Sequence, residues 1–304
     1  MKRVDIVILN WNRKNDTLEC LKSLSKLNTS NFKIELVVVD NGSTDDSVDA
    51  FKKLNLSNLR IIKNQENLGF AAGNNVGIRD AIARGADYVI ILNNDTIVDK
   101  NLAKEFMLAA RKYPRFGELS PKIYFAKGYE FHKKRYRKSE LGRVIWSAGG
   151  IIDWDNVYCT NRGVDEVDIG QYDLLEETDF ATGSCAFLNV RAIRTVGFFD
   201  ERYFMYLEDV DLSQRMKRNG WKVLYVPRAF LWHKVAQSSK IGGDLNDYFI
   251  TRNRLLFGLK YATPKTKVAL LRESLRLLIK GRKWQKKGVG DFYLLKFAKG
   301  SWKC

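Results

Sequence analysis

The sequence has little of what identifies several common classes of protein. Only four prolines and four cysteines occur in 304 residues, and the cysteines show none of the short paired spacings of metal or redox sites. We interpret them as free thiols in a reducing cytoplasm. No uninterrupted apolar run reaches the roughly 18 residues of a membrane-spanning helix. The four thiols are Cys20, Cys159, Cys185 and Cys304.

Low-complexity segments and internal repeats are also missing. The apolar stretch near Met1 is too short for a secretory signal, so we do not expect one there. Hydrophobic residues make up 45% of the chain, which is typical of a globular protein with a buried core. The charge is one-sided: the net value is +17, and +10 of it follows Ala262. We therefore expect one large domain or two small ones, soluble or peripheral to a membrane.

The first hundred residues alternate between two periodicities. Short runs rich in valine and isoleucine occupy residues 4–9, 35–40, 59–64 and 88–93, and helix-like spacing of apolar residues separates them. Alternating strands and helices predict a parallel sheet with crossover helices. The runs are apolar along nearly their whole length, as burial on both faces requires. The predicted class is α/β with a mostly parallel central sheet.

Polar residues follow each of these four strands at its carboxyl end. A solvated turn is the alternative for any one cluster, but four clusters in register favour a ligand site. In open parallel sheets ligands bind at this edge, because helix N-termini point into the crevice there. The clusters are Asn10 and Asn12, then Asp40-Asn41-Gly42, then residues 64–69, and Asn93-Asn94-Asp95.

Acidic residues in two stretches of the chain are candidates for metal binding or catalysis. Asp95 at a strand end suits Mg²⁺ or Mn²⁺ holding phosphate oxygens, although the same tripeptide would also form an Asx turn. Glu208-Asp209, with Asp211, follows a run of aromatic residues. These three either are ordinary acids of a first helical turn or include a general base with a raised pKa in an aromatic pocket.

The chain contains only two histidines. His233 follows a strand-like run and is expected to reach the same crevice, whereas His132 lies among basic residues and is expected to face solvent. Arg252 belongs to the sequence Arg-Asn-Arg in a predicted helix. It is a candidate clamp for a diphosphate, and a solvated helix face is the alternative.

Together these residues resemble the inverting family 2 glycosyltransferases of GT-A fold, in particular the branch of rhamnosyltransferases. The similarity covers roughly residues 1–257, and an ordered series of motifs is more specific than a lone glycine-rich loop. The motifs are ILNWNR, VVVDNGSTDDS, NLGFAAGNN, ILNNDT, WSAGG, ATGSCAF, FFDERYFMYLEDVDLSQR, WHK and RNRL.

The resemblance implies a role for each matching residue. Asn94 and Asp95 would meet the donor diphosphate and its Mg²⁺ or Mn²⁺ ion, and His233 would complete the metal site. The family usually has two aspartates in this triplet, whereas this chain has one. Asp209 would be the catalytic base beside Glu208. The remaining nucleotide-sugar contacts implied are Asn10, Asn12, Asp40, Asn67, Gly69 and, near the leaving diphosphate, Arg252.

The implied enzyme is a metal-dependent inverting hexosyltransferase of polysaccharide or glycolipid synthesis. Its donor would be a nucleotide-diphosphate sugar such as dTDP-rhamnose or a UDP-sugar, and its acceptor a glycan or a lipid-linked sugar. The expected division is a donor-binding half at residues 1–100, an acceptor half at 101–243 and a basic helical segment at 244–304. The expected location is the cytoplasm, including the inner face of the cell membrane.

Three rival classes are less consistent with the sequence. A nucleic-acid-binding protein would need its charge along a groove, whereas here the charge concentrates in the tail and in residues 127–143, so we expect no nucleic-acid partner. A dinucleotide oxidoreductase lacks its GxGxxG motif after the first strand. A sugar-phosphate nucleotidyltransferase remains the alternative, because it would use the same sheet edge, metal and nucleotide.

The basic tail includes an amphipathic pattern at residues 266–283. Val268, Leu271, Leu275, Leu278 and Ile279 recur at helical spacing among arginines and lysines. Such a helix either lies in the interface of an anionic membrane or packs its apolar face on the catalytic domain.

Overall fold

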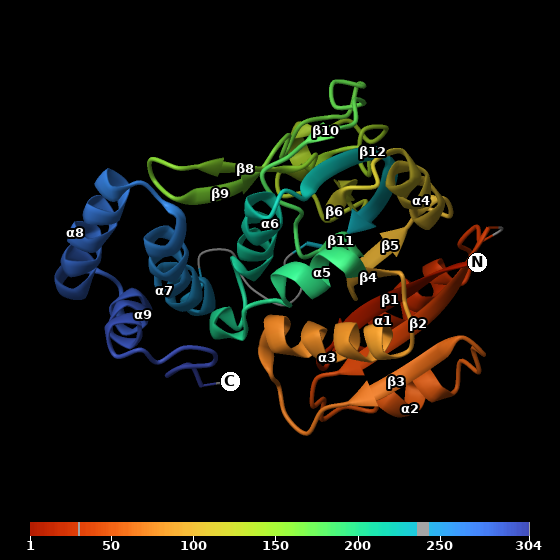
Figure 1. The fold of residues 1–304 in the computed structure, drawn as a ribbon, viewed down its shortest axis with the longest axis horizontal. Helices are drawn as coiled ribbons and strands as arrows, with labels where there is room; N and C mark the ends of the chain where they lie inside the picture. Colours follow the sequence, from red (N-terminus) through yellow and green to blue (C-terminus); the bar gives the residue numbers. More distant parts are fainter. Residues whose placement is uncertain (30, 236–242, 304) are drawn as a thin grey trace.

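The computed structural model describes residues 1–29, 31–235 and 243–303 (Figure 1). The strands are β1 (Lys2–Asn10), β2 (Phe32–Asp40), β3 (Leu59–Lys63), β4 (Tyr88–Asn93), β5 (Thr96–Val98), β6 (Phe116–Phe125), β7 (Ile145–Ser147), β8 (Gly150–Asp153), β9 (Tyr158–Asn161), β10 (Glu176–Glu177), β11 (Cys185–Asn189) and β12 (Lys222–His233). The helices are α1 (Lys14–Leu24), α2 (Ser47–Lys52), α3 (Gly69–Ala83), α4 (Leu102–Lys112), α5 (Val190–Val196), α6 (Glu208–Arg218), α7 (Asp244–Tyr261), α8 (Pro264–Lys280) and α9 (Lys283–Tyr293), with short 3₁₀ turns η1 (Lys133–Arg135) and η2 (Glu201–Tyr203).

The central sheet is mixed but mostly parallel in its first half. Its order is β10-β12-β6-β11-β4-β1-β2-β3, with β5 added beside β12 and β7 beside β6. The pairs β4-β1, β1-β2 and β2-β3 are all parallel, whereas β11 runs antiparallel to both β4 and β6. The α/β class and the four predicted strands are therefore confirmed. The parallel register sets Asn10 opposite Asp40, and Leu9 opposite Asn93, at one edge.

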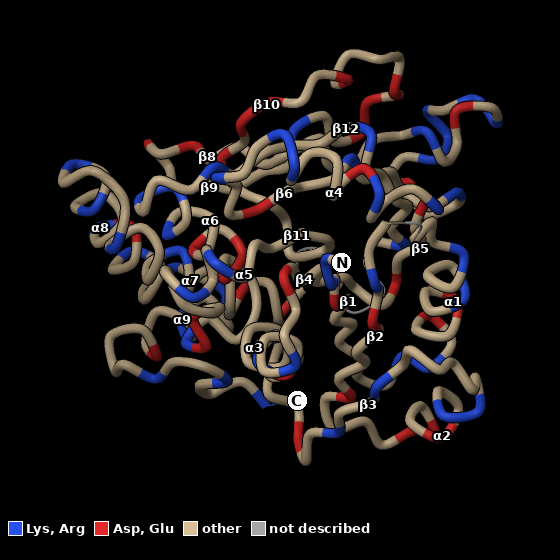
Figure 2. Tube along the Cα trace, turned by 45° about the vertical axis from the view of Figure 1, so that its right-hand side comes forward, with Lys and Arg blue, Asp and Glu red and all other residues tan. Residues whose placement is uncertain are grey.

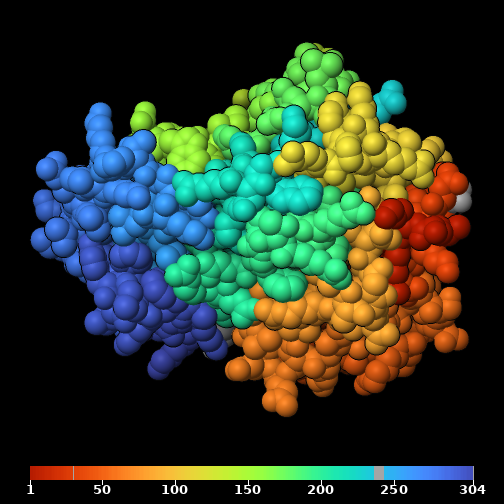
Figure 3. All heavy atoms as spheres, viewed as in Figure 1, coloured from red at the N-terminus to blue at the C-terminus, as the bar shows by residue number. Residues whose placement is uncertain are grey.

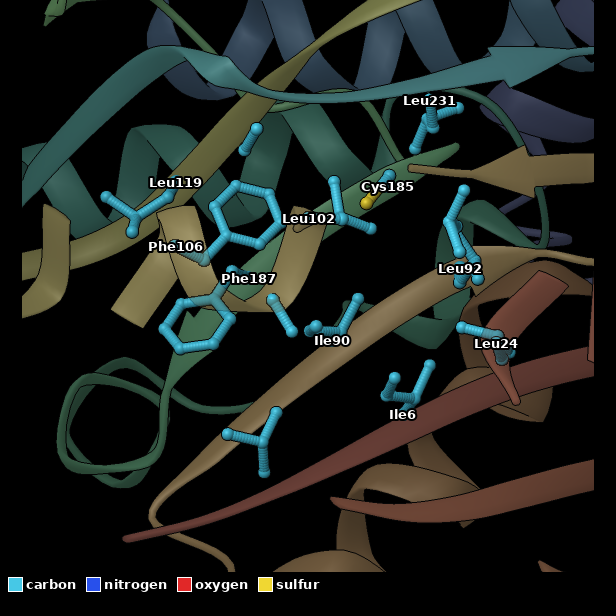
Figure 4. Close-up of a cluster of buried hydrophobic side chains, with 14 of the residues drawn as sticks. Ile6, Leu24, Ile90, Leu92, Leu102, Phe106, Leu119, Cys185, Phe187 and Leu231 are labelled. Atoms are coloured by element: carbon cyan, nitrogen blue, oxygen red, sulfur yellow. The ribbon is translucent and has the colours of Figure 1, made fainter. Parts of the chain in front are cut away.

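Helices cover both faces of the sheet because its strands are apolar on both sides. On one face, Leu24 of α1 and Phe106 of α4 pack over Ile6 and Ile90 (Figure 4). On the other face, α3, α5 and α6 pack over Val7 and the strands beside it. The result is a three-layer arrangement in which the carboxyl ends of β1, β2 and β4 open between helices.

The segment after residue 243 is helical, as its sequence predicts. Helices α7, α8 and α9 form one end of the molecule (Figures 1 and 3). Helix α8 buries only Thr266, Leu270 and Ser274. Within the described residues, none of the helices is long and apolar enough to cross a bilayer.

The described cysteines are free thiols, as the sequence predicts. Cys20 and Cys185 are buried, Cys159 is half-buried, and all three are free. Cys304 lies outside the described residues.

Candidate active site

The ends of β1 and β2 are joined by side chains. Asn10 is buried, and its Nδ2 donates to Asp40 Oδ1 (2.9 Å) and to Ser43 Oγ (3.1 Å). Asn12 has a positive φ of 53° and accepts from the Thr44 amide at 2.8 Å. The three predicted residues Asn10, Asn12 and Asp40 therefore form one polar platform, and Ser43 belongs to it as well.

Asn41 ties the next loop to this platform. Its Nδ2 donates to Asn67 Oδ1 (2.9 Å), and its Oδ1 accepts from Asn64 Nδ2 (3.0 Å). Gly69 follows with φ +81°, and a Cβ added there would lie 2.4 Å from the Phe204 ring. Asn67 and Gly69 thus lie beside the platform as predicted, whereas the central role of Asn41 is visible only in the structure.

The triplet Asn93-Asn94-Asp95 makes the turn from β4 to β5. Asn94 Nδ2 donates to Thr17 Oγ1 (2.9 Å), and Thr17 in turn donates to Asn10 Oδ1 (2.8 Å). The Asn93 amide donates to the Ser184 carbonyl at 2.9 Å. The two readings of the triplet, turn or site, are therefore compatible, because the turn itself carries these side chains to the platform.

Asp95 and His233 meet as the pattern predicts. His233 Nε2 lies 2.9 Å from Asp95 Oδ1, and both side chains are buried. That carboxylate oxygen and His233 Nδ1 nevertheless have no hydrogen-bond partner among the described residues. Asp95 Oδ1 thus lies beside one ring nitrogen without accepting a hydrogen bond from it, and the opposite ring nitrogen, Nδ1, is unpartnered in the described chain as well. A buried carboxylate and imidazole placed in this way can both serve as ligands of a divalent cation.

The protein itself offers few ligands for such a cation. No group of three or more histidine, cysteine, aspartate or glutamate side chains comes together as a metal site within the part of the chain that the structure describes. Mg²⁺ and Mn²⁺ commonly take only one or two carboxylates from protein and complete their coordination with phosphate oxygens and water. Asp95 and His233 are therefore compatible with a cation that binds together with a diphosphate.

Asp209 stands in the first turn of α6, after Leu207 in the left-handed region at φ 69°. Its Oδ2 accepts from the Gly183 amide at 2.7 Å, and its Oδ1 accepts from the Val210 amide at 2.8 Å. Burial raises the pKa of Asp209 above its ordinary value, although these two amides oppose the shift. The carboxylate is thus both held in place and made more basic.

The two neighbouring acids have different surroundings. Glu208 is buried and its Oε2 has no hydrogen-bond partner among the described residues. Burial, and after it the charge of Asp209, raises the pKa of Glu208 well above its ordinary value. Asp211 instead binds Arg215 Nε (2.7 Å), Lys260 Nζ (2.6 Å) and the Tyr261 hydroxyl (2.8 Å). Asp211 is therefore structural, and the acids of this cluster do not share one task.

The two acidic clusters meet at the turn that precedes β11. The Gly183 amide binds Asp209, and the carbonyl of the next residue, Ser184, accepts from the Asn93 amide. A Cβ added at Gly183 would lie 3.0 Å from the Phe70 ring, which follows Gly69. One turn thus connects the base candidate with the triplet and with the loop at Gly69.

Arg252 occupies a different environment from that predicted. It is fully buried, and its Nη1 donates to the Ala298 carbonyl (2.7 Å) while its Nη2 donates to the carbonyls of Arg202 (3.2 Å) and Tyr203 (3.0 Å). The guanidinium thereby fastens the C-terminal segment and η2 to α7. These contacts give Arg252 a structural task, and its contact with a donor diphosphate stays a prediction. His132, by contrast, is exposed as expected.

The chain is similar in sequence to known glycosyltransferases. A family model described as "Glycosyl transferase family 2" matches residues 5–197. The N-acetylglucosaminyl-diphospho-decaprenol L-rhamnosyltransferase of Mycobacterium tuberculosis is 30% identical over 214 residues, which cover 68% of this chain and 68% of the relative. The poly-beta-1,6-N-acetyl-D-glucosamine synthase of Staphylococcus aureus is 27% identical over 216 residues, 69% of this chain and 45% of the synthase.

Solved structures resemble this chain along nearly its whole length. GalNAc-T7 with UDP, GalNAc and Mn²⁺ superposes with a TM-score of 0.68 at 16% identity and covers 96% of this chain and 55% of that one. The mannosyltransferase of Pyrobaculum calidifontis with GDP-Man and Mn²⁺ gives 0.55 at 15% identity, with coverages of 96% and 74%. At such identities the likeness concerns the fold alone, which is the GT-A fold.

Proposed function

Because the chain belongs to glycosyl transferase family 2, we propose that this glycosyltransferase moves a sugar from a nucleotide-diphosphate donor to an acceptor hydroxyl with inversion. The observation that carries the proposal is the shared turn at Gly183 and Ser184, which joins Asp209 to the triplet at Asn93. A single displacement requires the base that deprotonates the acceptor and the site that holds the leaving diphosphate to lie close together, and this turn contacts both. The nucleotidyltransferase alternative is not favoured by the family match.

The proposed reaction is a direct substitution. The acceptor oxygen forms a bond to the anomeric carbon while the bond from that carbon to the diphosphate oxygen breaks, and the nucleoside diphosphate leaves with the electron pair. Asp209 accepts the proton of the attacking hydroxyl. Attack from the face opposite the leaving group inverts the configuration. Asp209 must be ionised to act, and its raised pKa makes the carboxylate a stronger base.

The donor is proposed to lie along the platform. Asn10, Asn12 and Asp40 would contact its base and ribose, and Asn67 and Gly69 would close over it. Asn94 and the cation held by Asp95 and His233 would meet the diphosphate. Such a cation supplies charge compensation for the leaving diphosphate. In this assignment residues 1–100 bind the donor, 101–243 the acceptor, and 244–304 form a basic helical segment.

The activities for which the relatives are named suggest the substrate class. Their names refer to a rhamnosyl transfer onto a diphospho-decaprenol sugar and to a poly-N-acetylglucosamine synthase. We propose a role in cell-surface polysaccharide or glycolipid synthesis, with dTDP-rhamnose or a UDP-sugar as donor and a glycan or lipid-linked sugar as acceptor. Two similar structures contain Mn²⁺, which supports the choice of Mg²⁺ or Mn²⁺ as the cation.

A donor screen tests the proposal. UDP-, dTDP- and GDP-sugars are added to the protein with Mn²⁺ or Mg²⁺, and thermal shift is measured. Nucleoside-diphosphate release is measured in the same mixtures, in which water takes the place of the acceptor hydroxyl. One donor class should stabilise the protein and release nucleoside diphosphate. EDTA or Asp95→Ala should abolish the release without unfolding the protein, because either change removes the cation site. Release of inorganic diphosphate from a nucleoside triphosphate would identify a nucleotidyltransferase instead, and full transfer in EDTA would refute the cation.

Helix α8 supports a membrane-proximal location. The apolar row predicted from sequence is exposed, with exposures between 37% for Leu271 and Leu278 and 74% for Ile279. Helix α8 packs Leu270 and Leu277 against α7 and α9 instead, and leaves this row in solvent. Arginines on the same helix suit anionic head groups, at roughly 1 kcal/mol for each basic residue. We therefore propose that the enzyme works at the inner face of the cell membrane.

Liposome co-sedimentation checks this location. The protein should bind anionic but not neutral vesicles, and added salt should weaken the binding. Leu275→Ser with Ile279→Ser should lower it at least fivefold, by removal of apolar area that inserts among acyl chains. Leu108→Ser, at an exposed leucine of α4, is the matched control. Equal binding by the double variant and the control would exclude α8 as the contact.

A further inference from the structure

A basic pocket lies at the start of α9, apart from the platform and the triplet. Its volume is about 650 Å³, within the range of small-molecule sites. Basic positions recur along the C-terminal helices in Figure 2. The pocket is lined by Lys283, Trp284, Lys286, Lys287, Ser301 and Lys303.

Within the described part of the chain, no pocket lysine forms an ion pair, and the one carboxylate beside them, the buried Asp291, interacts with Lys287 alone. The ion pairs formed at this end of the molecule are Arg254 with Glu273 and Arg282 with Asp247, and neither contains a pocket lysine. Lys283 instead lies over the Trp284 ring at 5.7 Å. Three of the lysines are in the first two turns of α9, where the helix dipole disfavours cations, and that first turn contains no acidic residue. An anion in the pocket would relieve this repulsion.

The walls of the pocket are held by a buried network. The Ser301 amide donates to Asp291 Oδ2 (2.7 Å) and its Oγ donates to Asp291 Oδ1 (2.9 Å). The Tyr248 hydroxyl donates to the same carboxylate, and the Ser301 amide also lies 3.0 Å from that hydroxyl. Asp291 and Tyr248 are buried at 1% and 0% exposure. The chain end that carries Ser301 and Lys303 is thus fixed against α7 and α9.

A layer of aromatic rings connects the pocket with the loop beside the donor platform. Trp284 and Trp302 are 4.6 Å apart between ring centroids, and Trp302 is 5.9 Å from Phe249. Phe249 stacks on Phe204 at 5.1 Å, and the Phe204 carbonyl accepts from the Phe70 amide at 2.7 Å. The pocket therefore belongs to the same packed body as the site at Asp209, on the other side of these rings.

We propose that this pocket is a second anion site, which binds the phosphate groups of a ligand other than the donor nucleotide. Lysine ammonium groups bind phosphate as point charges, and the tryptophan rings offer an apolar contact beside them. The phosphate can belong to a lipid-linked diphosphate acceptor or to the head group of a bilayer lipid. The acceptor source rests on the proposed function, whereas the head-group source does not.

Binding measurements on the whole protein test the site. The probes are inorganic pyrophosphate, farnesyl diphosphate and vesicles containing phosphatidylglycerol, with farnesol as the phosphate-free control. The variant is Lys283→Gln with Lys286→Gln. Lys287 is kept, because it faces the buried Asp291 carboxylate. Lys104→Gln with Arg111→Gln on α4 removes the same charge elsewhere. Asp95→Ala removes the cation site of the donor.

Pyrophosphate binding should fall at least tenfold in the double variant and stay within about twofold in the α4 control and in Asp95→Ala. A parallel loss for farnesyl diphosphate identifies the lipid-linked diphosphate as the source. A loss confined to vesicles identifies the head group. Unchanged binding of all three probes, or pyrophosphate binding that only Asp95→Ala removes, would overturn the proposal. None of these binding measurements requires sugar transfer. A negative result in the donor screen would therefore not change their interpretation.

Discussion

Replacement of Arg252 by lysine separates its two candidate roles. The guanidinium donates to the carbonyls of Ala298, Arg202 and Tyr203 at 2.7 to 3.2 Å and has no exposure to solvent. A lysine ammonium is a single point and cannot span carbonyls on two separate segments. We expect at least two of these charge-assisted bonds to be lost. Each is worth about 1.5–3 kcal/mol, so the free energy of unfolding should fall by about 3–6 kcal/mol.

Such a loss is a large share of the roughly 5–15 kcal/mol that stabilises a typical domain. The assay is urea unfolding followed by circular dichroism, together with the donor dissociation constant measured by calorimetry on the folded fraction. Arg79→Lys is the matched control, because Arg79 on α3 is half-exposed and pairs with the half-exposed Glu201. The control should lose about 1 kcal/mol or less. If Arg252→Lys left the free energy of unfolding unchanged but weakened donor binding tenfold, the structural role would be refuted. Contact of Arg252 with the donor diphosphate would then be the better assignment.

Two further predictions follow from buried groups near the site. Burial raises the pKa of Glu118 to about 8, so the stability that this carboxyl contributes is full below the pKa of the unfolded chain and is lost as the pH rises through 8. Glu118→Gln keeps an acceptor for Ser213 and should reduce the fall in unfolding free energy between pH 5 and 7 by about 2 kcal/mol. An unchanged dependence of the unfolding free energy on pH would contradict this. Gly69→Ala should lower the free energy of unfolding by about 1–3 kcal/mol more than Gly85→Ala does. Both glycines have φ above +80°, but only at Gly69 would the added Cβ clash with the Phe204 ring. Equal unfolding free energies of the two variants would mean that the ring moves aside.

The parallel half of the sheet was predictable because its signal is local. A strand buried on both faces needs an apolar residue at nearly every position, and the runs ending at Asn10, Asp40 and Asn93 satisfy that requirement. The parallel register then sets their polar ends at one edge. The pairing of Asp95 with His233 follows from the same logic, since His233 also ends a strand, β12, that pairs with β5.

Other parts of the site depend on contacts between distant segments and left no local signal. The sequence indicates that Asn41 and residues 64–69 lie at strand ends, but it does not show that Asn41 bonds to Asn64 and Asn67. The Gly183 amide is a backbone donor, and its partner Asp209 lies 26 residues away. The pattern Arg-Asn-Arg was compatible with a phosphate clamp or a solvated face, and it did not reveal that Arg252 is buried against backbone carbonyls. Periodicity predicted α8 as a helix, but only packing tells that its apolar row is exposed.

The most direct measurement compares donor binding with turnover in Asp209→Asn. The asparagine keeps the shape and one acceptor for the Gly183 amide but cannot take a proton. The account predicts that the donor dissociation constant stays within about threefold while turnover falls by about 10²-fold or more. The control is Asp211→Asn, which should destabilise the protein but leave turnover of the folded fraction nearly unchanged, because that carboxylate is occupied by Arg215 and Lys260. Wild-type turnover in Asp209→Asn, or loss of donor binding without loss of turnover, would contradict the assignment of the base.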